Sequence, residues 1–204
     1  KLFRYPLCFM DFETFATPVP LYDGIRPYQQ VPFQYSLHIL ETENSPIKHC
    51  DFLADGGVNP EKGFIENLLA AVPKDTIVLV WNATFERQRL LELMTAFPDK
   101  KRQIQNILDN IVDLMVPFQK RHIYRPGFHG SYSIKNVLPY MVPELSYKTL
   151  DIGDGLMASS EWLRMFQMTD PAQRKILREQ LLAYCQMDTY AMVRILQEMK
   201  RMAQ

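Results

Sequence analysis

The sequence contains few of the features that mark several common classes of protein. Its three cysteines among 204 residues, Cys8, Cys50 and Cys185, are widely spaced and odd in number. We therefore expect buried, reduced thiols and neither a disulfide framework nor a zinc site. No apolar run approaches the roughly 20 residues that span a bilayer, and no signal peptide precedes the first predicted strand. These absences predict a cytoplasmic protein with no membrane partner.

A net charge of either sign is also missing, because 23 Lys and Arg balance 23 Asp and Glu. This balance argues against a uniformly basic coat for nucleic acid, but the charges are unevenly spread. The segment from Pro117 to Lys135 contains no acidic residue, and its cations alternate with aromatic side chains. Cations beside aromatic faces suit single-stranded nucleic acid, whose phosphates need charge and whose bases stack. A solvated loop with a few covered aromatic rings is the alternative.

The composition, with 47% hydrophobic and 23% charged residues, is typical of a globular protein. The length fits one domain over residues 1–204, and we see no internal repeat, low-complexity tract or linker. Because the chain opens at Lys1 without a methionine and enters a strand almost at once, we expect a domain excised from a longer protein.

Hydrophobic periodicity predicts strands followed by alternating helices. Strands are expected at residues 5–12, 33–40 and 49–53, with connections that suit an antiparallel meander, and a buried strand at 76–81. Helices are expected at 60–71, 83–97, 101–112, 133–140, 161–167 and 171–202, and residues 149–158 are expected to form a loop. This order favours an α/β fold, in which a mixed sheet, antiparallel in its first strands and then parallel, is flanked by helices.

Two acids stand at the end of the first predicted strand. Asp11 and Glu13 share one face because side chains alternate with period two, and the residues before them are apolar on both faces. This pattern is typical of a central strand buried on two sides. Two carboxylates held so close repel and raise each other's pKa unless a cation lies between them. We therefore expect a divalent metal.

The last predicted helix carries an aspartate within its apolar stripe. At 100° per residue, Asp188 falls near the middle of the buried face, and Tyr184 lies on the same face one turn earlier. An unpaired carboxylate is costly there, so Asp188 should be paired, protonated or bound to metal. The alternative for Asp188 is a salt bridge to a core arginine or a helix N-terminus, and for Tyr184 it is a structural aromatic role.

A further acid is expected where the strand at 76–81 passes into the next helix. If this strand is parallel to the first, both end at the edge where open α/β sheets bind ligands. Asn82 or Thr84 is the expected N-cap, and Glu86 lies in the first helical turn, where the helix dipole favours a carboxylate. A solvent-facing glutamate is the alternative for Glu86. For Asp113, we expect an indirect role at the site or a turn cap.

Together these residues resemble the three exonuclease motifs of the DEDD (DnaQ-like) 3′-to-5′ exonuclease superfamily. The three segments, in motif order, are Asp11-x-Glu13, Asn82 to Glu86, and Tyr184-x-x-x-Asp188. The tyrosine four residues before the last aspartate resembles the tyrosine (DEDDy) subclass. The second motif normally ends in aspartate, and here Glu86 occupies that place.

Two other segments, residues 130–150 and 184–193, are similar to an uncharacterised bacterial domain family. The superfamily resemblance implies a ribonuclease H-like fold and phosphodiester hydrolysis with two Mg²⁺ or Mn²⁺ ions about 4 Å apart. Asp11 would bridge the ions, Glu13 and Asp188 would complete one site, and Glu86 would hold the water shell of the second. Tyr184 would orient the attacking water, because a phenol with a free pKa of about 10 is a poor base at neutral pH.

The resemblance predicts a 3′-to-5′ exonuclease acting on single-stranded DNA or RNA ends. The residues expected to contact the substrate are Thr14, Phe15, Asn82, Tyr124, Arg125 and Lys135. One alternative is a nucleic-acid-binding module of the same fold that has lost catalysis, for which Glu86 is the sequence indication. Another is an unrelated metal-dependent hydrolase or a structural domain. No protein partner is indicated.

Overall fold

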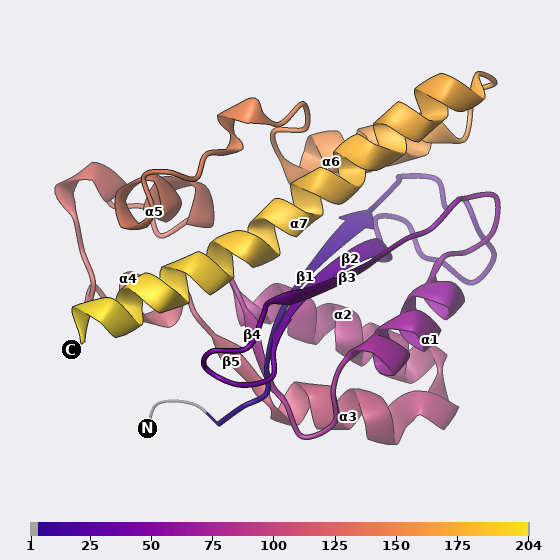
Figure 1. The fold of residues 1–204 in the computed structure, drawn as a ribbon. Helices are drawn as coiled ribbons and strands as arrows, with labels where there is room; N and C mark the ends of the chain where they lie inside the picture. Colours follow the sequence, from indigo (N-terminus) through magenta and orange to yellow (C-terminus); the bar gives the residue numbers. More distant parts are fainter. Residues whose placement is uncertain (1–3, 204) are drawn as a thin grey trace.

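A mixed five-stranded sheet forms the centre of the computed structural model, which describes residues 4–203 (Figure 1). The strands are β1 (Leu7–Phe15), β2 (Val31–Leu40), β3 (Lys48–Leu53), β4 (Ile77–Val80) and β5 (Ile111–Asp113), in the spatial order β3-β2-β1-β4-β5. The β3-β2-β1 pairs are antiparallel, and the β1-β4 and β4-β5 pairs are parallel. The predicted fold class, a mixed sheet flanked by helices, is confirmed.

Helices cover both faces of this sheet (Figure 1). They are α1 (Glu61–Ala71), α2 (Ala83–Ala96), α3 (Lys101–Asp109), α4 (Val116–Gln119), α5 (Ile134–Met141), α6 (Gly155–Met165) and α7 (Pro171–Met202). Short 3₁₀ turns occur at η1 (Pro98–Lys100), η2 (Pro126–Phe128) and η3 (Tyr147–Thr149). The described part of the chain has no helix that is both long and apolar enough to span a membrane.

The central strand β1 separates two apolar cores. Cys8, Met10 and Phe12 pack with residues of α1, α2 and α3 on one side of the sheet. Leu7 and Phe9 pack with residues of α7 on the other side. Because side chains alternate along β1, Asp11 and Glu13 lie on the same face as Leu7 and Phe9, which is the face covered by α7. Cys8 and Cys185 are buried, Cys50 is half-buried, and all three are free thiols.

Two predicted elements were wrong. Residues 101–112 were expected to be one helix, but α3 ends at Asp109 and residues 111–113 form β5. Tertiary pairing with β4 overrides the helical pattern in this short apolar run. Residues 149–158 were expected to form a loop, but α6 already begins at Gly155, because the Asp154 carboxylate accepts a hydrogen bond from the Met157 amide at 2.8 Å and caps the helix.

Candidate functional site

The acids predicted at the sheet edge meet in one cleft of about 260 Å³. β1 contributes Asp11 and Glu13, the first turn of α2 contributes Glu86, and α7 contributes Asp188. Asp11 is half-buried, whereas Glu13, Glu86 and Asp188 are buried. The side chains that line the cleft are those of Asp11, Phe12, Glu13, Trp81, Asn82, Phe85, Glu86, Ile134, Lys135, Tyr184, Asp188 and Met192. The structure therefore brings together all five residues predicted to be catalytic, with Asn82 and Lys135 beside them.

All four carboxyl groups of the cleft have raised pKa values, and burial is the largest cause for each. Burial, followed by repulsion from Asp188, raises the pKa of Asp11 and of Glu13 well above the usual range. Burial raises the pKa of Asp188 to about 6, although a Tyr147 hydrogen bond and the Lys135 charge oppose the shift. Burial and the charge of Asp113 raise the pKa of Glu86 to about 8. The cleft is thus a place where added positive charge would be stabilised.

Glu86 is placed by an N-terminal cap on α2. Asn82 occupies the N-cap position with a left-handed backbone (φ +75°), but its side chain makes no capping hydrogen bond. Instead, the Asp113 carboxylate accepts hydrogen bonds from the amides of Asn82 (3.1 Å) and Ala83 (2.9 Å). The same carboxylate accepts a 2.8 Å hydrogen bond from the Met115 amide, which confirms the turn cap considered for Asp113. With 1% of its surface exposed, Glu86 is not the solvent-facing glutamate of the alternative interpretation.

Asp188 is satisfied by a neutral donor. Its Oδ1 accepts a 2.6 Å hydrogen bond from the hydroxyl of Tyr147. Within residues 4–203, no lysine or arginine nitrogen forms an ion pair with Asp188, so the salt-bridge interpretation is not supported.

Tyr184 is paired with Lys135. The Lys135 ammonium donates hydrogen bonds to the Tyr184 hydroxyl oxygen (3.1 Å) and to the Gly153 carbonyl (2.6 Å). Burial, followed by the charges of Asp188 and Glu13, raises the pKa of Tyr184 above its ordinary value. Tyr184 therefore remains protonated at neutral pH.

Four residues predicted to contact substrate lie outside the cleft lining. The Thr14 hydroxyl donates to the Gln30 side chain at 2.6 Å. Phe15 is only 2% exposed and stacks on Trp162 with ring centres 4.8 Å apart, so its ring belongs to the core and offers almost no surface to a nucleotide. Tyr124 and Arg125 are exposed on the segment before α5. A hydrogen bond from Arg201 and, to a smaller extent, the Arg125 charge lower the pKa of Glu198, which lies about 15 Å along α7 from Asp188.

Two residues beside the acids had no predicted role. The Cys185 thiol lies 3.7 Å from Asp11 Oδ2, and possible ligand atoms of Asp11, Glu13 and Cys185 lie within 4.8 Å of one another. Burial raises the pKa of this thiol, which therefore stays protonated and is a poor ligand for a hard cation. Its position next to Tyr184 on the buried stripe could have indicated its location. Tyr147 lies in a segment without a periodic pattern, so nothing in the sequence pointed to it.

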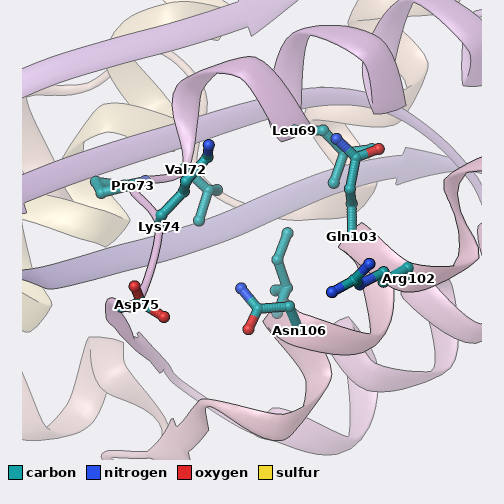
Figure 2. A pocket seen from close by; sticks show the side chains of 9 residues that line it. Leu69, Val72, Pro73, Lys74, Asp75, Arg102, Gln103 and Asn106 are labelled. Carbon is teal, nitrogen blue, oxygen red and sulfur yellow. The ribbon is translucent and has the colours of Figure 1, made fainter.

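A second groove, of about 460 Å³, lies between α1 and α3 (Figure 2). The polar side chains on its walls are those of Lys74, Asp75, Arg102, Gln103 and Asn106. Asp75 precedes β4, so this groove lies at the amino end of that parallel strand, whereas the carboxylates lie at the carboxyl end. None of the predicted site residues lines it.

Comparison with known proteins assigns a family. Residues 8–133 match the family described as a domain of unknown function, DUF2779. The chain belongs to the DUF2779 family. This DUF2779 chain is also similar to two uncharacterised proteins, UU173 of Ureaplasma parvum (26% identical) and the MG366 homolog of Mycoplasma pneumoniae (27% identical), each over 92% of the chain. The chain spans about 30% of the length of these curated relatives.

Proposed function

We propose that this DUF2779 chain is a metal-dependent 3′-to-5′ exonuclease of the DEDD tyrosine type, hydrolysing phosphodiester bonds at single-stranded nucleic-acid ends. The observation that carries the proposal is the convergence of Asp11, Glu13, Glu86 and Asp188 from three separate elements on one cleft beside Tyr184. The motif order in the sequence and the mixed sheet support the same assignment.

The donor set fits divalent cations. Carboxylate oxygens are the ligands that Mg²⁺ and Mn²⁺ prefer. Among the described residues, Glu86 Oε2 is buried and has no hydrogen-bond partner, which is costly unless a ligand satisfies it. One ion would be held by Asp11, Glu13 and Asp188. Asp11 would also contribute to the second ion, whose water shell Glu86 would hold. Two bound ions would supply an activated water and stabilise the leaving oxygen.

The chain's own groups would position the reactants. Because Lys135 donates to the Tyr184 oxygen, the phenol hydrogen remains free to donate into the cleft, to the attacking water or a phosphate oxygen. Lys135 uses two of its three N–H groups within the protein, which leaves one for a phosphate. The rings of Trp81 and Phe85 line the same cleft and offer faces to a terminal base.

Single-stranded substrates are supported by the surface next to the cleft. The acid-free segment from Pro117 to Lys135 exposes Tyr124 and Tyr132 along with Arg121 and Arg125. The Trp81 indole N–H donates to the Tyr132 carbonyl at 3.1 Å, so this segment continues directly into the cleft wall. Its cations and rings would contact the strand upstream of the scissile bond.

The proposal is tested with end-labelled single-stranded DNA and RNA in the presence of Mn²⁺. We expect stepwise shortening from the 3′ end, and a loss of at least roughly 100-fold in Asp11→Asn and Asp188→Asn, because changes outside a metal's ligand shell already cost about 10- to 100-fold. Asp109→Asn, at an exposed position, is the matched control. Binding without cleavage by the wild type would support the inactive binding module instead. Cleavage that survives Asp188→Asn would refute the mechanism.

A further inference from the structure

Tyr147 contacts the acidic cluster without lining the cleft. It lies 41 residues before Asp188, on η3, and its hydroxyl donates the 2.6 Å hydrogen bond to Asp188 Oδ1. Tyr184, by contrast, lines the cleft directly. The two phenols therefore occupy different positions, one behind a carboxylate and the other facing the space where a substrate would enter.

The Tyr147 hydroxyl is held in place by its surroundings. The ring packs against the apolar cluster that contains Trp162 and against a second cluster that contains Phe128. The turn is closed by a hydrogen bond from the Leu150 amide to the Tyr147 carbonyl and by the Ser146 side chain, which accepts from the Lys148 amide. A donor fixed in this way restricts the rotamers of the carboxylate that it bonds.

The neutrality of this donor has a chemical consequence. An arginine or lysine on Asp188 would also satisfy the buried oxygen, but its charge would repel a divalent cation. A phenol supplies a hydrogen bond without a charge, and it occupies only one of the two carboxylate oxygens. Burial also raises the pKa of Tyr147 above its ordinary value, which keeps its proton in place.

We propose that Tyr147 is a positioning residue, whose hydroxyl holds Asp188 Oδ1 so that the second oxygen is presented to a divalent cation. This inference rests on the proposed function, because it assigns Asp188 as a metal ligand. Lys135 connects the two phenols, since its ammonium lies 5.6 Å from the Tyr147 ring centre and 5.1 Å from that of Tyr184. Tyr147 thus acts through Asp188, while Tyr184 acts on the reactants.

The test is a calorimetric titration of Mn²⁺ into the wild type, Tyr147→Phe and Tyr140→Phe. Tyr147→Phe removes only the hydroxyl, and we expect Mn²⁺ affinity to fall about 10- to 100-fold, the usual effect of losing a group that orients a metal ligand. Tyr140 is an exposed tyrosine of the same region, and Tyr140→Phe should bind as the wild type does. Circular dichroism checks that all three proteins are folded.

A second measurement separates positioning from general weakening. In an Asp188→Asn background, Tyr147→Phe should produce no further loss of Mn²⁺ affinity, because the hydroxyl acts only through that carboxylate. Additive losses, or wild-type affinity in Tyr147→Phe, would overturn the positioning role while leaving the proposed function intact. A folded wild type that binds no Mn²⁺ at millimolar concentration would overturn the proposed function itself, and the role of Tyr147 with it.

Discussion

The ammonium group of Lys135 lies 3.1 Å from the hydroxyl oxygen of Tyr184 and 5.1 Å from the centre of its ring. This lysine was expected to contact phosphate, and two of its three N–H groups are also engaged inside the protein. Its charge also acts on the acids, because it opposes the rise in pKa that burial causes in Glu13 and in Asp188. Lys135 therefore supplies the cleft with a resident positive charge.

Removing this charge should shift the pH dependence of hydrolysis. In Lys135→Met, the pKa of Glu13 and of Asp188 should rise, so these carboxylates become protonated at a higher pH than in the wild type. We expect the acid limb of kcat/KM against pH, measured with Mn²⁺, to move to higher pH. Lys148→Met changes an exposed lysine and should leave the limb in place. A limb that stays or moves to lower pH in Lys135→Met would contradict this account.

Glu86 should make the metal-free protein less stable as pH rises. Its folded-state pKa is raised from 4.5 to about 8, so the folded state binds more protons than the unfolded state between these values. The contribution of Glu86 to the free energy of unfolding should therefore be fully present below about pH 4.5 and be lost as pH rises to about 8. A shift of this size corresponds to a contribution on the order of 5 kcal/mol.

Glu86→Gln removes the titrating group and nearly preserves the shape of the side chain. Urea denaturation with a chelator present should show a flatter decline between pH 5 and pH 8 in this variant, whereas Glu66→Gln, at an exposed position on α1, should follow the wild type. Mn²⁺ should raise the stability of the wild type more at pH 8 than at pH 5. An equally steep decline in Glu86→Gln would show that Glu86 does not carry the effect.

Phe15 should contribute to stability and have no contact with substrate. Phe15→Ala should lower the free energy of unfolding by about 3–5 kcal/mol, because it opens a cavity against Trp162 in the core. Val19→Ala, at a position with 73% exposure, should change stability by less than about 0.5 kcal/mol. A stable Phe15→Ala protein with a raised KM would instead restore the original expectation of a nucleotide contact.

The sequence was most informative where periodicity and burial agree. The apolar residues on both faces of β1 correctly identified it as a central strand. The alternation of side chains along the strand then placed Asp11 and Glu13 on one face. The helical stripe likewise placed Tyr184 and Asp188 together on the buried face of α7. These patterns are local, and the parallel pairing of β1 with β4 then brings Glu86 to the same edge.

Contacts made by irregular segments could not be predicted from hydrophobic periodicity. The three residues of β5 are too few for a period, and their pairing with β4 decides their conformation. The hydrogen bond from Tyr147 to Asp188 joins a short turn to a helix across 41 residues, without any repeated spacing. The engagement of Lys135 also depends on the Gly153 carbonyl, in a loop with no predictable path. Residues that orient the acids were therefore harder to predict than the acids themselves.

Two glycines beside the cleft provide a test of how tightly Glu13 is held. A Cβ on Gly155, the first residue of α6, would lie 3.2 Å from Glu13 Oε2, closer than ordinary van der Waals contact. We expect Gly155→Ala to displace this carboxylate by a few tenths of an ångström and to reduce Mn²⁺-dependent hydrolysis about 2- to 10-fold, because catalytic geometry tolerates little displacement. Alanine has the higher helix propensity, so the melting temperature should stay the same or rise.

Gly153→Ala is the matched control, because a Cβ there meets no atom within 4 Å, and the Gly153 carbonyl that accepts from Lys135 is retained. This variant should keep wild-type activity. The informative combination is lower activity without lower stability in Gly155→Ala alone, since general damage to the fold would reduce both. Equal activity in the two variants would mean that Glu13 has room to move, and a ligand that can shift so freely would not be a preorganised part of the site.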